Sequence, residues 1–469
     1  MKIVMKFGGV SVADGESMRN VGKIVERFRA EGNELVVVTS AMFNVTNSLL
    51  DAAKRAGKGQ REHVLKFVED TRERHIQSAR DAMSDKEVLE RTIQVIESKC
   101  DDLKNILLGI AHIGELTPRS KDFVVGFGER FSAPILQGVL EDLGMKAKAM
   151  TGGEAGIITD DHFGWAEPLM NVTTLEVRQV IDPLVEKGVV PVVGGFTAVT
   201  QDGTQTTLGR GGSDFTASII GAAIRADEVW VWKDVEGLMT ANPMIVKDAR
   251  MIDRISFSEA MELAHFGAQV IHPKALESAA RFQLPFRVKS LSNADGAGTL
   301  IVKEVRVKDG NVVKAITNID DVDLITVSGA SMVGTPRLAA KVLEILTDED
   351  IDVLMISQSS SEENITLAIP KDDGSKAQNA LELSLLGSKQ VREVSIEAGL
   401  SIVAVVGAGM KGTPGVAARV FGTMAANDIN IRAIAQGSSE LNISFITRKQ
   451  DAPKAIAALH TDFKLGECA

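Results

Sequence analysis

Residues 208–214 carry the clearest potential for chemistry in this chain, because they read LGRGGSD. Three glycines in five positions predict a loop, and the apolar spacing over 215–223 predicts that a helix follows at once. Backbone N–H groups are free at a helix N-terminus, and the helix dipole favours an anion there. Arg210 adds a planar cation that suits a carboxylate or a phosphate, and Asp214 adds an acid that could orient a metal or a substrate. A glycine-rich turn capped by Ser213 explains the same pattern, so the loop needs partners elsewhere in the chain.

The elements that must position this loop form an alternating strand and helix pattern. Residues 2–7 and 35–39 are short apolar strands, each followed by a turn and a helical pattern, and 189–195 and 228–232 are further apolar strands. This order is typical of an α/β domain whose mainly parallel sheet is covered by helices on both faces. Ligands bind outside the carboxyl ends of such strands. The residues expected at those ends are Lys6, Gly8, Gly9, Ser11 and Ser40.

Composition excludes several classes of function. The chain has 469 residues, which predicts two to four domains, and its net charge of −11 argues against a nucleic-acid partner. Its apolar runs fall short of the ~20 residues of a membrane span, and no signal peptide is visible. Two cysteines, Cys100 and Cys468, provide no disulfide framework. We therefore expect a cytoplasmic protein that binds neither membranes nor nucleic acid.

An internal repeat occupies the C-terminal third of the chain. Residues 329–367 align without gaps with residues 407–445, and each copy predicts a strand, a glycine loop, a helix and two strands. Two such copies predict paired α+β modules, which favour ligand sensing or assembly over chemistry. Gln358 and Gln436 occupy the equivalent position in the two copies, each directly after an apolar strand.

Two motifs suggest other cofactors but lack the necessary context. Residues 407–412 match GxGxxG, yet the equivalent segment of the first copy has Ser331 in place of the second glycine, and too little chain follows for a dinucleotide-binding domain. The sequence contains no Walker A motif and no Cys/His cluster with zinc spacing.

The remaining set of residues indicates phosphoryl transfer. It comprises two cations (Lys6 and Arg210), two glycine pairs (Gly8-Gly9 and Gly211-Gly212) and two acids (Glu129 and Asp214). Phosphoryl transfer needs positioning and charge neutralisation rather than a Ser–His–Asp or Cys–His arrangement. A carboxylate acceptor, with a pKa of about 4, is already ionised near neutral pH and needs no general base. The residues by themselves therefore predict a phosphoryl-transfer site on an α/β sheet, followed by a regulatory pair of repeats.

Six segments, in order, resemble the signatures of one family. They are KFGGVSV at 6–12, SAMFNVTN at 40–47, GFGERFSAP at 126–134, TTLGRGGSDF at 206–215, WKDVEGLMTANP at 232–243 and FGAQVIHP at 266–273. On these motifs the chain resembles the monofunctional aspartate kinases of the amino-acid kinase superfamily, and its repeats resemble their two C-terminal ACT domains. The resemblance covers essentially the whole chain. It implies a catalytic domain over 1–302 and ferredoxin-like ACT domains over 311–390 and 399–469.

The resemblance also implies a reaction and roles for individual residues. ATP and L-aspartate would give ADP and 4-phospho-L-aspartate with Mg²⁺, the first step toward lysine, methionine and threonine. Lys6 would hold the transferring phosphoryl group, and Asp214 would order the lysine and the metal. The aspartate site would comprise Ser40, Ala41, Thr46, Glu129, Arg210 and Ser213, with Arg210 on the α-carboxylate and Glu129 on the α-ammonium. The nucleotide site would comprise Lys6, Phe7, Gly8, Gly9, Gly212, Trp232, Lys233, Asp234 and Gln269.

Regulation and assembly follow from the same resemblance. Gln358 and Gln436 would contact a feedback effector, with threonine favoured and lysine second, and the ACT domains would pair the chain into a homodimer or a dimer of dimers. Four residues depart from the usual family pattern: Val10, Lys233, Met244 and Gln269. Two alternatives stay open, and Val10 and Gln269 motivate the second of them. One is a kinase for glutamate or acetylglutamate, and the other is a degenerate kinase that acts as an amino-acid-binding regulator.

Overall fold

The computed structural model describes residues 1–267, 270–305, 312–329, 336–358, 364–386 and 391–467, and the chain forms two compact units. The first unit contains Met1–Leu238, Asp253–Phe257 and Val270–Val305, and the second contains Met239–Ile252, Ser258–Gln269 and Arg306–Ala469. The predicted domain limits of 1–302, 311–390 and 399–469 stay a prediction, because the units interleave along the chain. Among the described residues, no helix combines the length and the hydropathy needed to cross a lipid bilayer.

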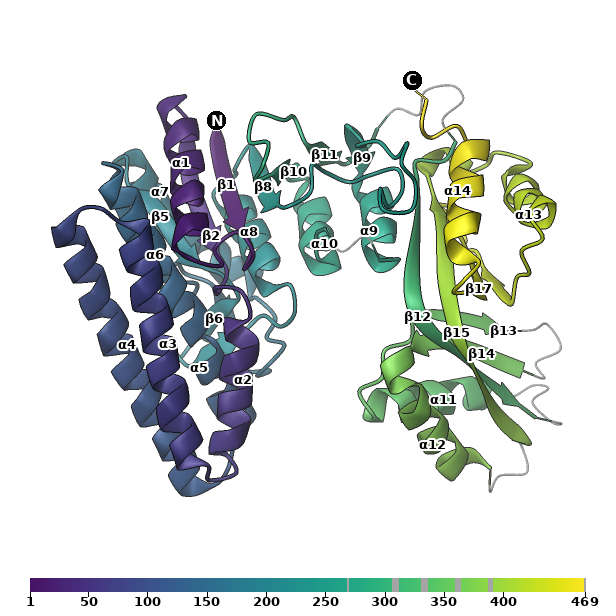
Figure 1. Cartoon of the computed structure of the whole chain (residues 1–469), viewed down its shortest axis with the longest axis horizontal. Coiled ribbons are helices and arrows are strands. Elements are labelled where there is room, and N and C mark those ends of the chain that lie inside the picture. Colours follow the sequence, from purple (N-terminus) through teal and green to yellow (C-terminus); the bar gives the residue numbers. More distant parts are fainter. Residues whose placement is uncertain (268–269, 306–311, 330–335, 359–363, 387–390, 468–469) are drawn as a thin grey trace. The chain divides into compact units, whose positions relative to one another are not determined.

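A mainly parallel sheet forms the centre of the first unit (Figure 1). Its strands lie in the order β3 (Ala147–Thr151), β5 (Val190–Gly194), β2 (Glu34–Thr39), β1 (Lys2–Phe7), β8 (Glu228–Lys233), β10 (Phe286–Ser290), β11 (Thr299–Val302) and β9 (Arg254–Ser256). The central strand β1 pairs in parallel with β2 and β8, while β11 runs antiparallel to β10. Apolar runs form these strands because both faces of the sheet are covered.

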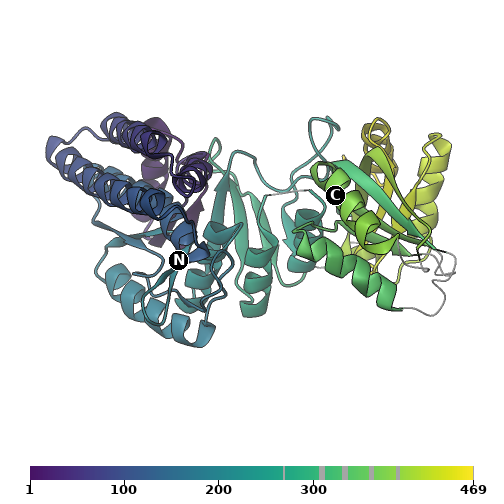
Figure 2. The ribbon, with the colours of Figure 1, turned by 90° about the horizontal axis from the view of Figure 1, so that it is seen from below.

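Helices cover both faces of this sheet, as Figures 1 and 2 show. One layer contains α1 (Gly15–Ala30), α2 (Val45–Ala56), α3 (Arg61–Ala82), α4 (Lys86–Ile113), α5 (Pro118–Val125) and α6 (Phe127–Asp142). The other contains α7 (Met170–Glu186), α8 (Gly212–Ala223) and α10 (Pro273–Phe282). Side chains alternate along a strand, so Phe7 packs into the core under the first layer while Lys6 faces α8.

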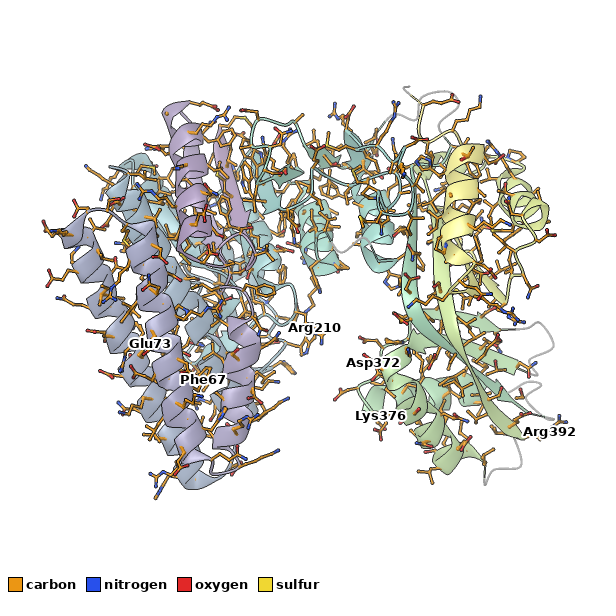
Figure 3. All side chains as sticks on the ribbon, viewed as in Figure 1. Phe67, Glu73, Arg210, Asp372, Lys376 and Arg392 are labelled. Atoms are coloured by element: carbon orange, nitrogen blue, oxygen red, sulfur yellow. The ribbon has the colours of Figure 1, made fainter. Side chains whose placement is uncertain are left out.

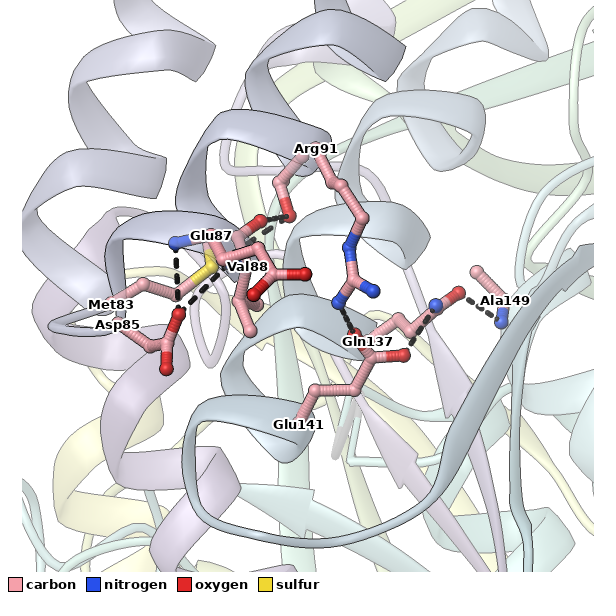
Figure 4. Close-up of polar contacts among 9 residues, drawn as sticks. Met83, Asp85, Glu87, Val88, Arg91, Gln137, Glu141 and Ala149 are labelled. Carbon is pink, nitrogen blue, oxygen red and sulfur yellow. Dashed lines mark hydrogen bonds and ion pairs between the residues drawn. The ribbon is translucent and has the colours of Figure 1, made fainter.

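Polar contacts fix the ends of the first helical layer (Figure 4). Arg91 of α4 donates to Glu141 of α6 at 2.6 Å, and Gln137 donates to the same carboxylate at 2.8 Å. The carbonyl oxygen of the Gln137 side chain in turn accepts the backbone N–H of Ala149 at 2.7 Å. These contacts tie α4 and β3 to α6, the helix that carries Glu129.

A small sheet leads into the glycine-rich loop. It comprises β4 (Ile158–Thr159), β6 (Thr197–Thr200) and β7 (Gln205–Thr207), and β6 and β7 form a hairpin. Residue 208 follows β7 directly and α8 begins at Gly212. The predicted arrangement of a loop followed at once by a helix is therefore correct.

The second unit contains the two repeats. Its six-stranded antiparallel sheet has the order β13 (Met355–Gln358), β14 (Asn364–Pro370), β12 (Ala315–Ser328), β15 (Glu393–Val406), β17 (Asn442–Arg448) and β16 (Ala433–Ala435). The helices are α9 (Phe257–His265, all but its first residue in this unit), α11 (Pro336–Asp348), α12 (Gly374–Leu385), α13 (Val416–Ala426) and α14 (Ala452–Asp462). Short 3-10 turns form at η1 (Lys371–Asp373) and η2 (Ala408–Met410).

The order of elements repeats as predicted. β12, α11, β13 and β14 of the first copy correspond to β15, α13, β16 and β17 of the second. The unit contains two apolar clusters, and the long strands β12 and β15 contribute to both of them. The GxGxxG segment at 407–412 does not open a helix, because α13 begins only at Val416. It therefore lacks the strand–turn–helix geometry of a dinucleotide site.

Candidate active site

A cavity of about 680 Å³ lies in the first unit at the carboxyl ends of β1 and β2, where parallel sheets bind ligands. The predicted site residues among its lining are Lys6, Gly9, Ser40, Ala41, Thr46, Glu129, Arg210, Gly212, Ser213 and Asp214. Segments that are far apart in the sequence thus meet in one cavity.

A buried ion pair forms one side of the cavity. Lys6 Nζ lies 2.5 Å from Asp214 Oδ1, and both side chains are largely shielded from solvent. Burial alone would raise the pKa of Asp214, but the charges of Lys6 and Lys233 lower it below its usual value. Burial lowers the pKa of Lys233, and the nearby Lys6 charge adds to this effect. Two cations lie around the Asp214 carboxylate, and the Asp234 charge offsets part of the charge of Lys233. The Lys6 end of this cluster suits an anionic ligand.

A second carboxyl group in the cavity forms no ion pair with the described residues. Glu129, in the first turn of α6, is buried, and its Oε1 accepts the backbone N–H of Ala41 at 3.0 Å. Its Oε2 has no hydrogen-bond partner among the described residues. Burial raises the pKa of Glu129 to about 8, although the Ala41 hydrogen bond and the Lys6 charge oppose the shift. An unpaired buried carboxyl oxygen is well suited to accept an ammonium group from a ligand.

The turn after β2 is held by α6. Ser132 Oγ donates to the Ser40 carbonyl at 2.7 Å, and Glu129 accepts from Ala41. One helical turn separates Ser132 from Glu129, so one face of α6 orders both the turn and the acid. The Ser40–Ala41 backbone is therefore fixed at the cavity wall.

The glycine-rich loop closes the other wall. Gly209 and Gly211 adopt φ values of +75° and +71°, in the left-handed region that favours glycine. A Cβ at Gly209 would lie 2.6 Å from the Trp165 ring, and one at Gly211 would lie 2.1 Å from the His272 ring. Rings pack directly on the loop backbone, which only glycine permits.

Arg210, between those glycines, points toward solvent. It lines the cavity, and Figure 3 shows it at the edge of the first unit. In the part of the chain that the structure describes, its side chain has no hydrogen bond or ion pair. Its position therefore depends on the backbone of the loop.

The other predicted residues lie outside the lining. The rings of Phe7 and Trp232 are fully buried and stack with centroids 5.7 Å apart, so only their backbone groups could reach a nucleotide. Gly8 lies beside Lys6 Nζ, and Lys233 and Asp234 lie at the end of β8. Gln269 lies outside the described residues.

The sequence analysis missed several residues of the lining, and Asp122 and Trp165 are two of them. Asp122 is buried, and Trp165 is 52% exposed. Both side chains contact the backbone of segments that are distant in the sequence. No local sequence pattern could therefore predict them. The side chain of His272 instead accepts the N–H of Lys274 at the start of α10, which is a capping role.

The two glutamines of the repeats lie in the second unit. Gln358 ends β13 and Gln436 directly follows β16, and both are exposed. Ser357 Oγ donates to the Ile434 carbonyl at 3.3 Å, so these equivalent strands approach each other.

Comparison with known proteins places the chain in a family. A model of the amino acid kinase family matches residues 1–290, and an ACT-domain model matches residues 325–385 and 403–463. The chain is 33% identical to chloroplastic aspartokinase 1 of Arabidopsis thaliana, over 98% of this chain and 80% of that protein. It also spans about half the length of the curated bifunctional aspartokinase/homoserine dehydrogenases of Arabidopsis thaliana and Zea mays.

Solved structures agree with this placement. E. coli aspartokinase III in complex with aspartate and ADP is 28% identical with a TM-score of 0.79, and its complex with lysine and aspartate has a TM-score of 0.83. Each covers 98% of this chain and 99% of the other. The chain therefore belongs to the amino acid kinase family, as an aspartokinase with two ACT domains. The predicted fold class and the resemblance are confirmed.

Proposed function

We propose that this chain transfers the γ-phosphoryl group of ATP to the side-chain carboxylate of L-aspartate, giving ADP and 4-phospho-L-aspartate. The observation that carries the proposal is the charge pattern of one cavity. It combines the Lys6–Asp214 pair with a buried carboxyl oxygen of Glu129 and with Arg210, both without a hydrogen-bond partner among the described residues. The complex of E. coli aspartokinase III with aspartate and ADP supports it.

The groups that do not react would fix the amino acid. Arg210 would bind the α-carboxylate through its planar fork, and Glu129 would accept the α-ammonium on its free Oε2. Ser40, Ala41, Thr46 and Ser213 line the same cavity and would shape the aspartate pocket. Holding both charged groups of the α-carbon would direct the side-chain carboxylate, at the other end of the amino acid, toward Lys6.

The phosphate groups would bind at the cationic end. Lys6 would neutralise charge on the transferring group, and the backbone N–H groups of Gly8, Gly9 and Gly212 would donate to phosphate oxygens. Asp214 would hold Lys6 in place through the 2.5 Å ion pair. The described residues contain no cluster of three or more His, Cys, Asp or Glu side chains that could hold a metal ion. Mg²⁺ typically keeps several waters and binds substrate phosphates, and it would neutralise phosphate charge when bound.

The nucleotide would lie beyond the ends of β1 and β8. Lys233, Asp234 and Gln269 would surround it, while Phe7 and Trp232 would contribute backbone groups because their rings are buried. Val10 and Gln269 replace residues that are common in the family, and they motivate the alternative of an amino-acid-binding regulator without kinase activity.

Trapping of the acyl phosphate tests the proposal. The protein is incubated with MgATP, hydroxylamine and either aspartate, glutamate or acetylglutamate. Formation of aspartyl hydroxamate supports aspartate kinase activity, and another hydroxamate assigns a different acceptor. Absence of every hydroxamate, with aspartate binding retained in calorimetry, would favour the regulator.

For regulation, we propose that threonine inhibits the enzyme, with lysine as the second candidate. The approach of the equivalent strands β13 and β16 supports a ligand seam near Gln358 and Gln436. The structure of E. coli aspartokinase III with lysine supports amino-acid effectors in this family. We further propose a homodimer or a dimer of dimers that functions in the cytoplasm.

A further inference from the structure

The backbone of the glycine-rich loop determines where Arg210 lies, because the Arg210 side chain makes no hydrogen bond or ion pair with the described residues. The Gly209–Gly211 turn has φ values that cost little for glycine, which also leaves the turn free to adopt other conformations. The Arg210 guanidinium can bind a ligand carboxylate through two parallel hydrogen bonds only if this turn keeps one conformation. The structure shows two residues outside the turn that can hold it.

Asp122 of α5 is the first of them. Its Oδ2 accepts the backbone N–H of Gly164 at 2.8 Å and that of Thr207 at 2.9 Å. Thr207 is the last residue of β7, two residues before Gly209, and its carbonyl accepts the N–H of Ala166 at 3.0 Å. One buried oxygen thus joins three segments: α5, the turn at 164–166 and the end of β7. Burial raises the pKa of Asp122, although the two backbone N–H groups oppose this shift.

Trp165, next to Gly164, is the second. Its ring packs against Gly209 closely enough that a Cβ there would lie 2.6 Å from Cε3. Lys274 Nζ lies 4.8 Å from the centroid of the ring, and the same ammonium pairs with Glu167 at 2.9 Å. These contacts keep a half-exposed indole in a fixed position over the glycine turn.

We propose that Asp122 and Trp165 are positioning residues that fix the Gly209–Gly211 turn and thereby aim the Arg210 guanidinium into the amino-acid end of the cavity. This inference rests on the proposed function, because it assigns Arg210 to the acceptor amino acid. We call the contacts of Asp122 and Trp165 with the segments at 164–166 and 207–209 the clamp. All of these contacts are internal to the protein, so the clamp should form without any ligand.

Hydrogen exchange of the ligand-free protein tests the clamp itself. Asp122→Ala should increase deuterium uptake both at 164–166 and at 205–209, because both segments lose their shared acceptor. Asp142→Ala is the matched control. Asp142 Oδ1 also accepts two backbone N–H groups from a distant segment, those of Ser84 and Asp85, but Asp142 does not line the cavity. The control should increase uptake only around residues 84 and 85, and equal uptake at 205–209 in the two variants would overturn the inference.

Steady-state kinetics tests the positioning role. Asp122→Ala should raise KM for aspartate by about 10-fold or more and change KM for ATP by less than about 2-fold. Asp122→Asn keeps an acceptor oxygen and should recover most of the loss. Trp165→Ala should also raise KM for aspartate, while Trp165→Phe keeps a ring on Gly209 and should raise it less.

The outcomes separate this inference from the proposed function. If Asp122→Ala does not fold, Trp165→Ala decides, and an unchanged KM for aspartate in that variant contradicts the inference. Equal increases in both KM values would also contradict it. If the native protein makes no aspartyl hydroxamate, the proposed function fails, and the exchange experiment still decides whether the clamp exists.

Discussion

At the scale of single residues, Lys6 provides the most direct test of the phosphoryl-transfer site. Removal of a preorganised cation from a site that excludes water should lower kcat by about 100-fold or more. Lys6→Ala should show this loss in a coupled ADP assay. The control is Lys2→Ala on the same strand, where the lysine pairs with the partly exposed Asp182 and lies outside the cavity. A near-native kcat for Lys6→Ala would mean that the site is assigned wrongly.

Lys6→Ala should also destabilise the protein, because it leaves Asp214 buried without its partner. Breaking a buried ion pair from one side typically costs about 3–5 kcal/mol. Circular dichroism and thermal melting therefore accompany the kinetics, so that loss of turnover is not confused with loss of fold.

Glu129 gives the site a predictable pH dependence. Without an ammonium group beside it, Glu129 has a pKa of about 8, above the ordinary value of 4.5, so the carboxyl group is protonated at neutral pH. A ligand ammonium favours the carboxylate and expels that proton, since Lys6 is already paired with Asp214. Aspartate affinity should therefore rise from neutral pH to about 8 and then level off.

Calorimetry in buffers of different ionisation enthalpy measures the protons released on aspartate binding. We expect a net release near neutral pH in the native protein and none from this group in Glu129→Gln. The other charged residues that line the cavity are Lys6, Lys121, Asp122, Arg210 and Asp214, and all of them are kept in that variant. Equal proton release in both proteins would place the titration on another group.

At the scale of elements, the glycine-rich loop can be compared with a second glycine turn in the same hairpin region. Gly203 and Gly209 both have positive φ, at +82° and +75°, but a Cβ at Gly203 would meet nothing within 4 Å. Alanine at either position should lower the free energy of unfolding by about 1–2 kcal/mol, because the left-handed conformation is unfavourable for a residue with a Cβ. Only alanine at Gly209 also displaces the Trp165 ring.

Gly209→Ala should therefore raise KM for aspartate and lower the melting temperature, whereas Gly203→Ala should lower only the melting temperature. Thermal unfolding and kinetics of the two variants, measured side by side, separate backbone strain from the contact with Trp165. Matching KM values in the two variants would show that this contact does not position the loop.

At the scale of the whole molecule, regulation is the central prediction. We expect threonine to inhibit, and Gln358→Ala to weaken that inhibition without lowering the uninhibited kcat, because an effector acts only through its preference for one state. Activity is titrated with threonine and with lysine, for both proteins, and light scattering measures the oligomer with and without the effector. Inhibition by lysine alone would reverse the assignment of the effector, and insensitivity to both would remove the regulatory role.

Much of this protein could be predicted from its sequence, because the relevant signals are local. Apolar strand runs alternating with helical patterns determine a parallel α/β sheet, and the spacing GRGG followed by an apolar helix determines the loop and the start of α8. The gapless repeat determines two equivalent modules. Lys6 could be selected because it lies at the carboxyl end of an apolar strand, and Glu129 because apolar residues flank it. Arg210 could be selected because it lies in the glycine-rich loop.

Only the tertiary structure decided which of those residues meet and which lie apart. The pairing of Lys6 with Asp214 depends on β1 and α8, which are more than 200 residues apart in the chain. The second carboxyl oxygen of Glu129 is left for a ligand because the first accepts the backbone N–H of Ala41. The burial of Trp232 against Phe7 follows from strand register and not from residue type. Asp122 and Trp165 leave no pattern in the sequence, because their contacts are with backbone. The Asp122 carboxylate accepts backbone N–H groups, and the Trp165 ring packs on the backbone of a glycine. Every residue has a backbone, so no particular residue type marks these contacts.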